Sequence, residues 1–307
     1  MDSLCIKGVH YLTQGELQMS NLHHPFVSVI IPTYNREGII LESVKSVLEQ
    51  TYENFELIIV DDCSKDNTIK ALEGICDARL KIIKQDTNSG ACAARNRGIR
   101  ESRGKIIAFQ DSDDLWDSTK LEKQIKSLLD NKADIVFCQG VRIMGEKEEL
   151  LPKQEKSGFV EKRTLQTRSL VSTQMLLGYS YCFRENMFDE NMPRYQDYDL
   201  VIRLAEKYRF YYLAEPLVTI RVQSDSITND SMKLVRARKL LLEKYPAIID
   251  GNQEMKADML KSLLHNEALN GISDYHTAIE LFKTNKSVKN GIIVFLSRFG
   301  LYKRFAK

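Results

Sequence analysis

The sequence predicts an α/β fold built on a mostly parallel sheet that helices cover on both faces. Two observations indicate this. From Val27 onward, short β-branched runs alternate with stretches of helical periodicity. These runs are apolar along their length rather than at every second residue, which is typical of strands buried on both faces of a parallel sheet.

The elements follow from this alternation. We expect strands at 27–31, 55–60, 80–84, 105–109 and 134–137, and helices at 38–50, 66–77, 91–102 and 118–131. Beyond about residue 140 the alternation weakens. Strand-like runs at 181–184 and 210–220 lie on either side of a helix at 197–208, and helical patterns follow at 231–245, 253–270, 274–284 and 287–305.

This organisation predicts three regions in the 307 residues, a length that suits one large domain with a smaller appendage. Residues 1–25 form an N-terminal extension, in which His23 and His24 have no third ligand at a spacing suited to a metal site. Residues 26–228 form the α/β domain, with halves at 26–138 and 139–228. Residues 229–307 form a C-terminal helical region.

Composition excludes several classes of protein. The net charge is +2, from 44 basic and 42 acidic residues, which argues against a nucleic-acid binder with a cationic surface throughout. The six cysteines include no C-x-x-C pair, so we expect reduced thiols. No segment has the pattern of a secretory signal or the length of a transmembrane helix. We therefore expect a cytoplasmic protein.

Polar residues follow four of the expected strands. They are Pro32-Thr33-Tyr34-Asn35, Asp61-Asp62, Asn88-Ser89-Gly90 and Asp111-Ser112-Asp113-Asp114. In open α/β sheets ligands bind beyond the carboxyl ends of the strands, where such loops converge. We therefore expect the functional site at this edge.

The carboxylates of two of these loops indicate a divalent metal. Like charges gathered at one sheet edge repel unless a cation lies between them. Oxygen ligands without cysteine or histidine favour Mg²⁺ or Mn²⁺, which commonly join carboxylates to phosphates. A diphosphate-bearing substrate follows. An acidic turn that caps the next helix is the structural alternative for Asp111–Asp114.

The nucleotide site has further candidates. A carboxylate at Asp61 or Asp62 can accept a hydrogen bond from a pyrimidine N–H, although the pair could simply start a turn, and Tyr34 offers an aromatic face for the base. Dinucleotide-binding and P-loop proteins are disfavoured, since neither the G-x-G-x-x-G nor the Walker lysine motif is present.

Four ordered motifs together resemble the inverting family 2 glycosyltransferases of the GT-A fold. They are Val27–Asn35, Val60–Asp66, Asn88–Gly98 and Phe109–Asp114, and the resemblance extends over about residues 27–225. It implies the GT-A nucleotide-diphospho-sugar transferase fold with a C-terminal helical appendage.

The resemblance also implies roles for individual residues. Nucleotide-binding residues would be Pro32, Thr33, Tyr34, Asn35, Asp62, Arg95, Asp111 and Ser112, and the metal ligands would be Asp113 and Asp111. Arg95 could instead be an exposed helix charge. Arg221 would contact the diphosphate, or else form a surface salt bridge.

A base must remove the proton of the acceptor hydroxyl, a task suited to Asp or Glu. The resemblance implies Asp197, at the start of a helix, with Asp199 as the alternative. A carboxylate that only stabilises the helix N-terminus is the structural explanation. The sequence departs from the family at Gln196, where Glu is usual, and at Gln223, where a histidine is frequent.

The sequence thus predicts a metal-dependent, inverting hexosyl- or N-acetylhexosaminyltransferase that uses Mn²⁺ or Mg²⁺. The donor would be a nucleotide-sugar, UDP-linked by resemblance or dTDP-linked. The acceptor would be a saccharide or lipid-linked saccharide in surface-glycan biosynthesis. One alternative is a catalytically silent sugar-nucleotide-binding or scaffold protein. The other is a nucleotidyltransferase, although the basic Gly-rich loop expected after the first strand of such an enzyme is missing.

The C-terminal tail suggests contact with a membrane surface. After Glu280 there are seven basic residues and no acidic one, interleaved with large apolar residues. A basic amphipathic helix can lie in the interface of an anionic bilayer. We expect peripheral attachment to the inner face of the cell membrane, or alternatively a helix packed on the catalytic domain.

Overall fold

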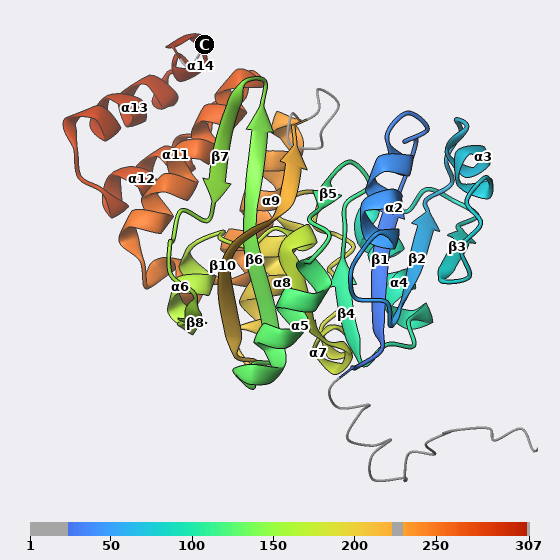
Figure 1. Cartoon of the computed structure of the whole chain (residues 1–307). Coiled ribbons are helices and arrows are strands. Elements are labelled where there is room, and N and C mark those ends of the chain that lie inside the picture. Colours follow the sequence, from blue (N-terminus) through green and yellow to red (C-terminus); the bar gives the residue numbers. More distant parts are fainter. Residues whose placement is uncertain (1–23, 223–229, 306–307) are drawn as a thin grey trace, which may run out of the picture.

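The computed structural model describes residues 24–222 and 230–305 and is organised around one sheet of ten strands (Figure 1). The order along the sheet is β3-β2-β1-β4-β9-β6-β10-β5, with β7 beside β6 and β8 beside β10. The strands are β1 (Val27–Thr33), β2 (Phe55–Asp61), β3 (Leu80–Lys84), β4 (Ile106–Phe109), β5 (Leu115–Trp116), β6 (Ile135–Met144), β7 (Lys147–Leu151), β8 (Gly158–Val160), β9 (Leu176–Tyr179) and β10 (Phe210–Arg221).

Strand direction confirms the predicted fold class. Strands β1 to β4 pair in parallel, as do β6 and β10. Strand β9 lies antiparallel between β4 and β6, and the short strands β5, β7 and β8 are also antiparallel to their neighbours. The sheet is therefore mixed, and the half formed by β1 to β4 is parallel.

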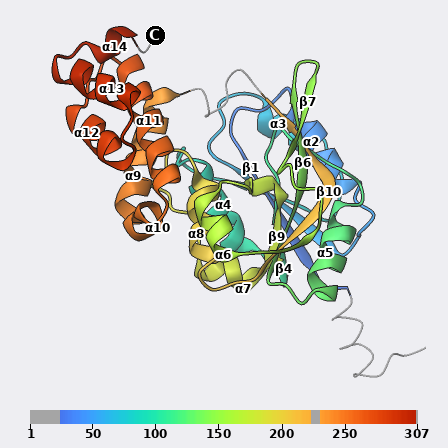
Figure 2. The same cartoon turned by 90° about the vertical axis from the view of Figure 1, so that its left-hand side faces the viewer.

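Helices cover both faces of this sheet. They are α2 (Ile40–Leu48), α3 (Thr68–Glu73), α4 (Ala91–Glu101), α5 (Lys120–Asp130), α6 (Lys162–Thr167), α7 (Ser180–Glu185) and α8 (Gln196–Leu204), with a 3-10 turn at Thr173–Met175. Figure 2 shows α4, α6, α7 and α8 on one side of the sheet and α2 and α5 on the other. Every residue of β1, β2 and β4 is buried, which explains their continuous apolar runs.

Gly98 sets the distance between α4 and the sheet. A Cβ at this position would lie 2.4 Å from Cγ2 of Ile30 on β1, so any larger residue would push the helix outward. Arg95 lies one turn earlier on the same helix. The glycine therefore fixes how close Arg95 lies to the carboxyl ends of the strands.

Four of the C-terminal helices begin with a side chain that caps the first turn. The C-terminal helices are α9 (Ser231–Lys244), α10 (Pro246–Asp250), α11 (Gln253–Leu269), α12 (Tyr275–Thr284), α13 (Val288–Arg298) and α14 (Tyr302–Phe305). Asp230, Asn252, Asp274 and Ser287 each accept a hydrogen bond from a backbone N–H of the first turn, at α9, α11, α12 and α13 respectively. Such caps satisfy amide groups that a helix leaves without partners.

The C-terminal helices share a hydrophobic cluster with α8. Tyr198 and Ile202 of α8 pack with Ala237 and Leu241 of α9 and with Met259 of α11. The start of α8, where the candidate base lies, is thus supported by the C-terminal region.

Two predicted elements are wrong. Residues 181–184 are not a strand but part of α7, and the strand beside β4 is β9. Cys182 and Phe183 are buried, but a run of four residues is too short for periodicity to distinguish strand from helix. The helix expected at 287–305 is interrupted at Gly300, whose φ of 67° ends α13 before α14 begins.

Some predictions fall on residues that the structure does not describe. They include the extension at 1–23 with His23, and Gln223 in the segment 223–229. Within the described ranges, each helix is too short or too polar to cross a bilayer.

Candidate functional site

Two adjoining cavities lie at the carboxyl ends of β1, β2 and β4. The first, of about 620 Å³, is lined by the polar loops that follow these strands and by α4. The second, of about 570 Å³, lies between the Asp111–Asp114 loop, the start of α8 and the end of β10. Both cavities are lined by Arg95, Asp111 and Asp113. A ligand in one cavity would therefore meet a ligand in the other at these three side chains.

The loop after β1 supplies the aromatic face. The Tyr34 side chain lines the first cavity and is 40% exposed. The next residue, Asn35, has a φ of 50° and is held by two bonds to the loop after β2: its backbone N–H donates to Ser64 Oγ at 2.9 Å, and its side-chain oxygen accepts from the N–H of Lys65 at 2.8 Å. The tyrosine ring is therefore presented by a turn that is fixed at its base.

The two aspartates after β2 have different roles. Asp61 is buried and accepts hydrogen bonds from the backbone N–H and the hydroxyl of Ser64, so it stabilises the turn. Asp62 lines the first cavity, and its two carboxylate oxygens accept 2.7 Å bonds from Gln85 and from the backbone N–H groups of Ser89 and Gly90. Three donors hold this carboxylate in one orientation, and Oδ2 keeps lone-pair capacity for a ligand.

Arg95 is buried in the wall between the two cavities. Its guanidinium donates to Asp111 Oδ1 at 2.6 Å and to the side-chain oxygen of Gln196 at 3.1 Å, and it lies 5.3 Å from the centre of the Phe188 ring. The exposed-charge alternative is therefore wrong. Gln196 here joins the start of α8 to this arginine.

The four residues of the acidic loop differ in burial and in hydrogen bonding. Asp114 lines the second cavity but is buried, and it accepts from the backbone N–H of Arg221 at 2.9 Å and from Gln174 at 2.7 Å. Burial, with Asp111 and Asp113 nearby, raises the pKa of Asp114 well above its usual value. Asp111 and Asp113 are partly exposed and line both cavities, whereas Ser112 lines only the first.

These residues fit a metal held by few protein ligands. Across the described ranges, no group of three or more His, Cys, Asp or Glu side chains converges as a complete metal site. Asp113 lines both cavities, and Asp111 beside it pairs with Arg95. Mg²⁺ and similar ions are commonly bound by one or two carboxylates together with substrate phosphates and water. The donor set is thus compatible with an ion that binds with its diphosphate.

Asp197 lies in the second cavity at the start of α8. One carboxylate oxygen accepts from the backbone N–H of Tyr198 at 2.8 Å, and the preceding Tyr195 adopts a left-handed φ of 59° that turns the chain into the helix. Burial raises the pKa of Asp197 to about 6, although the Tyr198 amide and the Arg95 charge oppose this shift. A carboxylate with such a pKa suits a general base near neutral pH.

Asp199, the alternative base, is held by contacts that stabilise the fold. Its side chain is fully buried, and its carboxylate accepts from Arg203 at 2.9 Å and from the Tyr245 hydroxyl at 2.7 Å, and pairs with Lys244. These contacts join α8 to the end of α9. Asp199 does not line either cavity, which leaves Asp197 as the candidate.

Arg221 lines the second cavity and forms a salt bridge. Its guanidinium lies 2.6 Å from the carboxylate of Glu42 on α2, and both side chains are partly exposed. This contact matches the surface-salt-bridge alternative. A diphosphate contact would require Arg221 to exchange this partner.

The sequence did not indicate one residue of the first cavity, Lys233. This side chain comes from α9 in the C-terminal region and lines the cavity together with Tyr34 and Asp113. Its ammonium group lies 4.0 Å from the carboxylate of Asp230. No local motif marks such a lysine, because only the packing of α9 beside the α/β domain brings it there.

Comparison with known proteins shows what the chain is similar to. The model of the family described as "Glycosyl transferase family 2" matches residues 28–189. The putative colanic acid biosynthesis glycosyl transferase WcaA of Escherichia coli strain K12 is 32% identical over 194 residues, which are 61% of this chain and 68% of WcaA. The UDP-Glc:alpha-D-GlcNAc-diphosphoundecaprenol beta-1,3-glucosyltransferase WfgD of Escherichia coli is 46% identical over 112 residues, 36% of this chain and 44% of WfgD.

The share of each relative that the chain covers, and its similarity to a solved structure, differ between the proteins compared. The chain spans about a third of the length of three Rickettsia glycosyltransferases to which it is 36–37% identical. The structure of S. aureus TarS 1–349 in complex with UDP-GlcNAc superposes with a TM-score of 0.64 at 18% identity, covering 89% of this chain and 92% of that one. This similarity confirms the predicted glycosyltransferase fold.

Proposed function

This chain belongs to glycosyl transferase family 2, and from that premise we propose that it transfers a sugar, with inversion, from a nucleotide-sugar to a saccharide acceptor. One observation carries the proposal. Two cavities meet at Arg95, Asp111 and Asp113, and a carboxylate with a raised pKa, Asp197, lies in the second. This is the arrangement that a direct transfer between two bound substrates requires.

The first cavity is assigned to the donor. Tyr34 would stack on the base, Asp62 would accept the pyrimidine N–H, and Pro32, Thr33, Asn35 and Ser112 would line the nucleotide. We infer a UDP-sugar, with a dTDP-sugar as the alternative, and the UDP-Glc donor in the name of WfgD supports this choice. Residues 26–138 would thus bind the donor and 139–228 the acceptor, with 229–307 as the helical region.

A divalent ion, Mn²⁺ or Mg²⁺, would be held by Asp113, with Asp111 beside it. When bound, it supplies positive charge that stabilises the departing diphosphate. Arg95 contributes a fixed charge at the same place, since Asp111 and Gln196 hold its guanidinium between the cavities.

Asp197 would remove the proton of the acceptor hydroxyl. The oxygen of that hydroxyl then forms a bond to the anomeric carbon as the bond from this carbon to the diphosphate oxygen breaks. The electron pair of the broken bond leaves with the nucleoside diphosphate. Attack from the side opposite to the leaving group inverts the configuration, and no covalent enzyme intermediate is needed.

The acceptor is proposed to be a lipid-linked saccharide in the assembly of a surface glycan. The names of WcaA, a colanic acid biosynthesis enzyme, and of WfgD, whose acceptor is a diphosphoundecaprenol, support this class. An enzyme with such an acceptor would work as a peripheral protein at the inner face of the cell membrane.

A panel of nucleotide-sugars tests the proposed function. The purified chain is incubated with each donor and Mn²⁺ or Mg²⁺, with and without a diphospho-lipid saccharide, and release of the nucleoside diphosphate is measured. We expect release with at least one uridine- or thymidine-linked sugar, and faster release with the acceptor. Binding of donors without release of any would favour the silent sugar-nucleotide-binding alternative.

Lys233 is proposed to contact the donor diphosphate from α9. We expect Lys233→Gln to raise the KM for the donor about tenfold with little change in kcat, because a lost ionic contact to the bound donor weakens its binding. Initial rates at varied donor concentration measure this. Arg236→Gln is the matched control, since Arg236 is exposed on the same helix but does not line the cavity. Equal effects of the two variants would contradict the assignment.

A further inference from the structure

Helix α13 presents an apolar face that is largely exposed in the part of the chain that the structure describes. Val288, Ile292, Phe295 and Phe299 are 84%, 54%, 61% and 59% exposed. Their spacing of four, three and four residues places them along one side of the helix. The rings of Phe295 and Phe299 lie 5.1 Å apart, edge to face. We call these four side chains the α13 face.

The fold does not need this face for its own packing. On the other side of α13, Asn290, Ile293 and Ser297 are buried, and Ile293 joins a cluster with residues of α11 and α12. The buried side of α13 thus packs on its helical neighbours α11 and α12. The exposure of four large apolar residues on one helix is of the kind that marks an interaction surface.

Cations border the α13 face. By helical geometry Lys289 and Arg298 lie roughly a quarter turn to either side of it. Lys283, Lys286, Lys303 and Arg304 are also exposed, and within residues 230–305 no ion pair involves any of these six side chains. The last acidic residue of the chain, Glu280, is bonded to Lys256 at 2.7 Å. The surface is thus apolar at its centre and positive at its rim.

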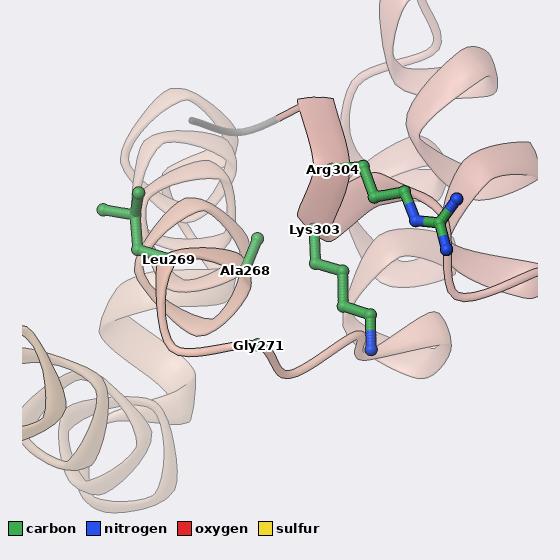
Figure 3. A pocket seen from close by; sticks show the side chains of 5 residues that line it. All are labelled: Ala268, Leu269, Gly271, Lys303 and Arg304. Carbon is green, nitrogen blue, oxygen red and sulfur yellow. The ribbon is translucent and has the colours of Figure 1, made fainter.

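A nearby cavity extends this positive surface. It has a volume of about 480 Å³ and is lined by Ala268, Leu269 and Gly271 at the end of α11 and by Lys303 and Arg304 of α14. Figure 3 shows the Lys303 side chain extending from α14 beside the Gly271 turn. It holds no carboxylate, thiol or histidine, so it lacks the groups of a catalytic site.

We propose that the α13 face and its cationic border dock on an anionic lipid bilayer. Large apolar side chains would enter the interface between headgroups and acyl chains, while the lysines and arginines attract the anionic headgroups. A second copy of the chain fits less well, because a symmetric dimer through this face would place like charges opposite each other.

The location of the face suits the acceptor proposed above. Figure 1 shows α13 and α14 at the end of the molecule toward which β2, β6 and β10 point, which is also the end where the two cavities lie. Docking there would bring the cavities near the membrane surface. The biological purpose of such docking rests on the proposed function. Lipid binding itself, however, requires no catalytic turnover and can be tested separately.

Flotation of the full chain with vesicles, in the absence of donor, tests the proposal. Vesicles of phosphatidylcholine alone are compared with vesicles that also contain phosphatidylglycerol. We expect flotation only with the anionic vesicles and less of it at high salt. Phe295→Ser with Phe299→Ser should lower partitioning at least about tenfold, because two large apolar side chains no longer enter the interface.

Matched variants separate the contributions. Leu150→Ser removes a side chain that is 47% exposed on β7, away from α13, and should leave flotation unchanged. Lys289→Glu with Arg298→Glu should lower flotation, whereas Lys70→Glu, an exposed lysine on α3, should not. Circular dichroism and nucleotide release in solution show that each variant is folded, so failure of lipid binding is distinguishable from failure of the transferase proposal.

Several results would overturn the inference. They are equal flotation of the phenylalanine and Leu150 variants, equal binding to neutral and anionic vesicles, and no flotation of the unaltered chain. Self-association that is lost in the phenylalanine variant, without vesicle binding, would assign the face to a second copy instead. Binding of an acidic protein without vesicle binding would assign it to that partner.

Discussion

Asp197→Asn is expected to lower kcat about 10³-fold while donor affinity and stability change little. A positioned general base contributes roughly 10²–10⁴-fold to a proton-transfer step, and an amide cannot accept the proton of the acceptor hydroxyl. The amide keeps the shape of the side chain and can still accept the bond from the Tyr198 amide. Steady-state rates, donor titration and thermal unfolding of the two proteins measure the three quantities.

The pH profile gives the same prediction a second readout. The base works in its ionised form, and burial raises the pKa of Asp197 to about 6. The rate should therefore be level above pH 7 and fall about tenfold per unit below pH 6, as the carboxylate becomes protonated. The acid limb should be missing from the residual activity of Asp197→Asn. An unchanged limb, or unchanged turnover, would contradict the assignment.

Asp199→Asn distinguishes the two aspartates. Asp199 is buried among Arg203, Lys244 and Tyr245, so loss of its charge should lower the free energy of unfolding by about 3 kcal/mol, the order found when a buried ion pair loses one partner. The protein that remains folded should keep most of its turnover and its acid limb. A loss of turnover in stable Asp199→Asn protein would instead make Asp199 the base.

Asp113→Asn is expected to lower kcat/KM for the donor about 10²-fold or more and to weaken the dependence of rate on Mn²⁺. A bound metal ion stabilises the negative charge on a phosphoryl group in the transition state by several kcal/mol, and an amide is a poorer metal ligand than a carboxylate. Initial rates at varied donor and Mn²⁺ concentrations measure kcat/KM and the metal dependence. A sample with chelator gives the rate without metal.

The control for this variant is a carboxylate outside the cavities. Asp130→Asn removes an exposed carboxylate at the end of α5 and should keep the metal response of the unaltered protein. Full turnover of the unaltered chain in chelator, or an Asp113→Asn protein with an unchanged metal response, would show that no ion at Asp113 supports the reaction.

The sequence could place the candidate site at one sheet edge because strand ends are a local feature. Buried apolar runs identify β1, β2 and β4, and the polar loops after them must then meet at one sheet edge. Tyr34, Asp62, Arg95, Asp111 and Asp113 line a common cavity there. Which carboxylate of a loop is buried is not a local feature, however, and only the structure shows that Asp114 is held by Gln174 and Arg221.

Features that depend on distant packing could not be predicted. Lys233 reaches the first cavity because α9 packs beside α8, a contact between segments that no motif links. The interaction of Gln196 with Arg95 joins residues 101 positions apart. The apolar side chains of α13 were visible in the sequence, but their exposure depends on which side of the helix packs against α11 and α12.

The configuration of the product tests the central claim most directly. The claim is that one displacement takes place where the two cavities meet, with Asp197 as base. With a donor whose sugar is α-linked to the diphosphate, the anomeric proton coupling in the NMR spectrum of the product should report a β-linkage. An α-linked product would contradict the account, because retention requires a different mechanism from a single attack by the acceptor.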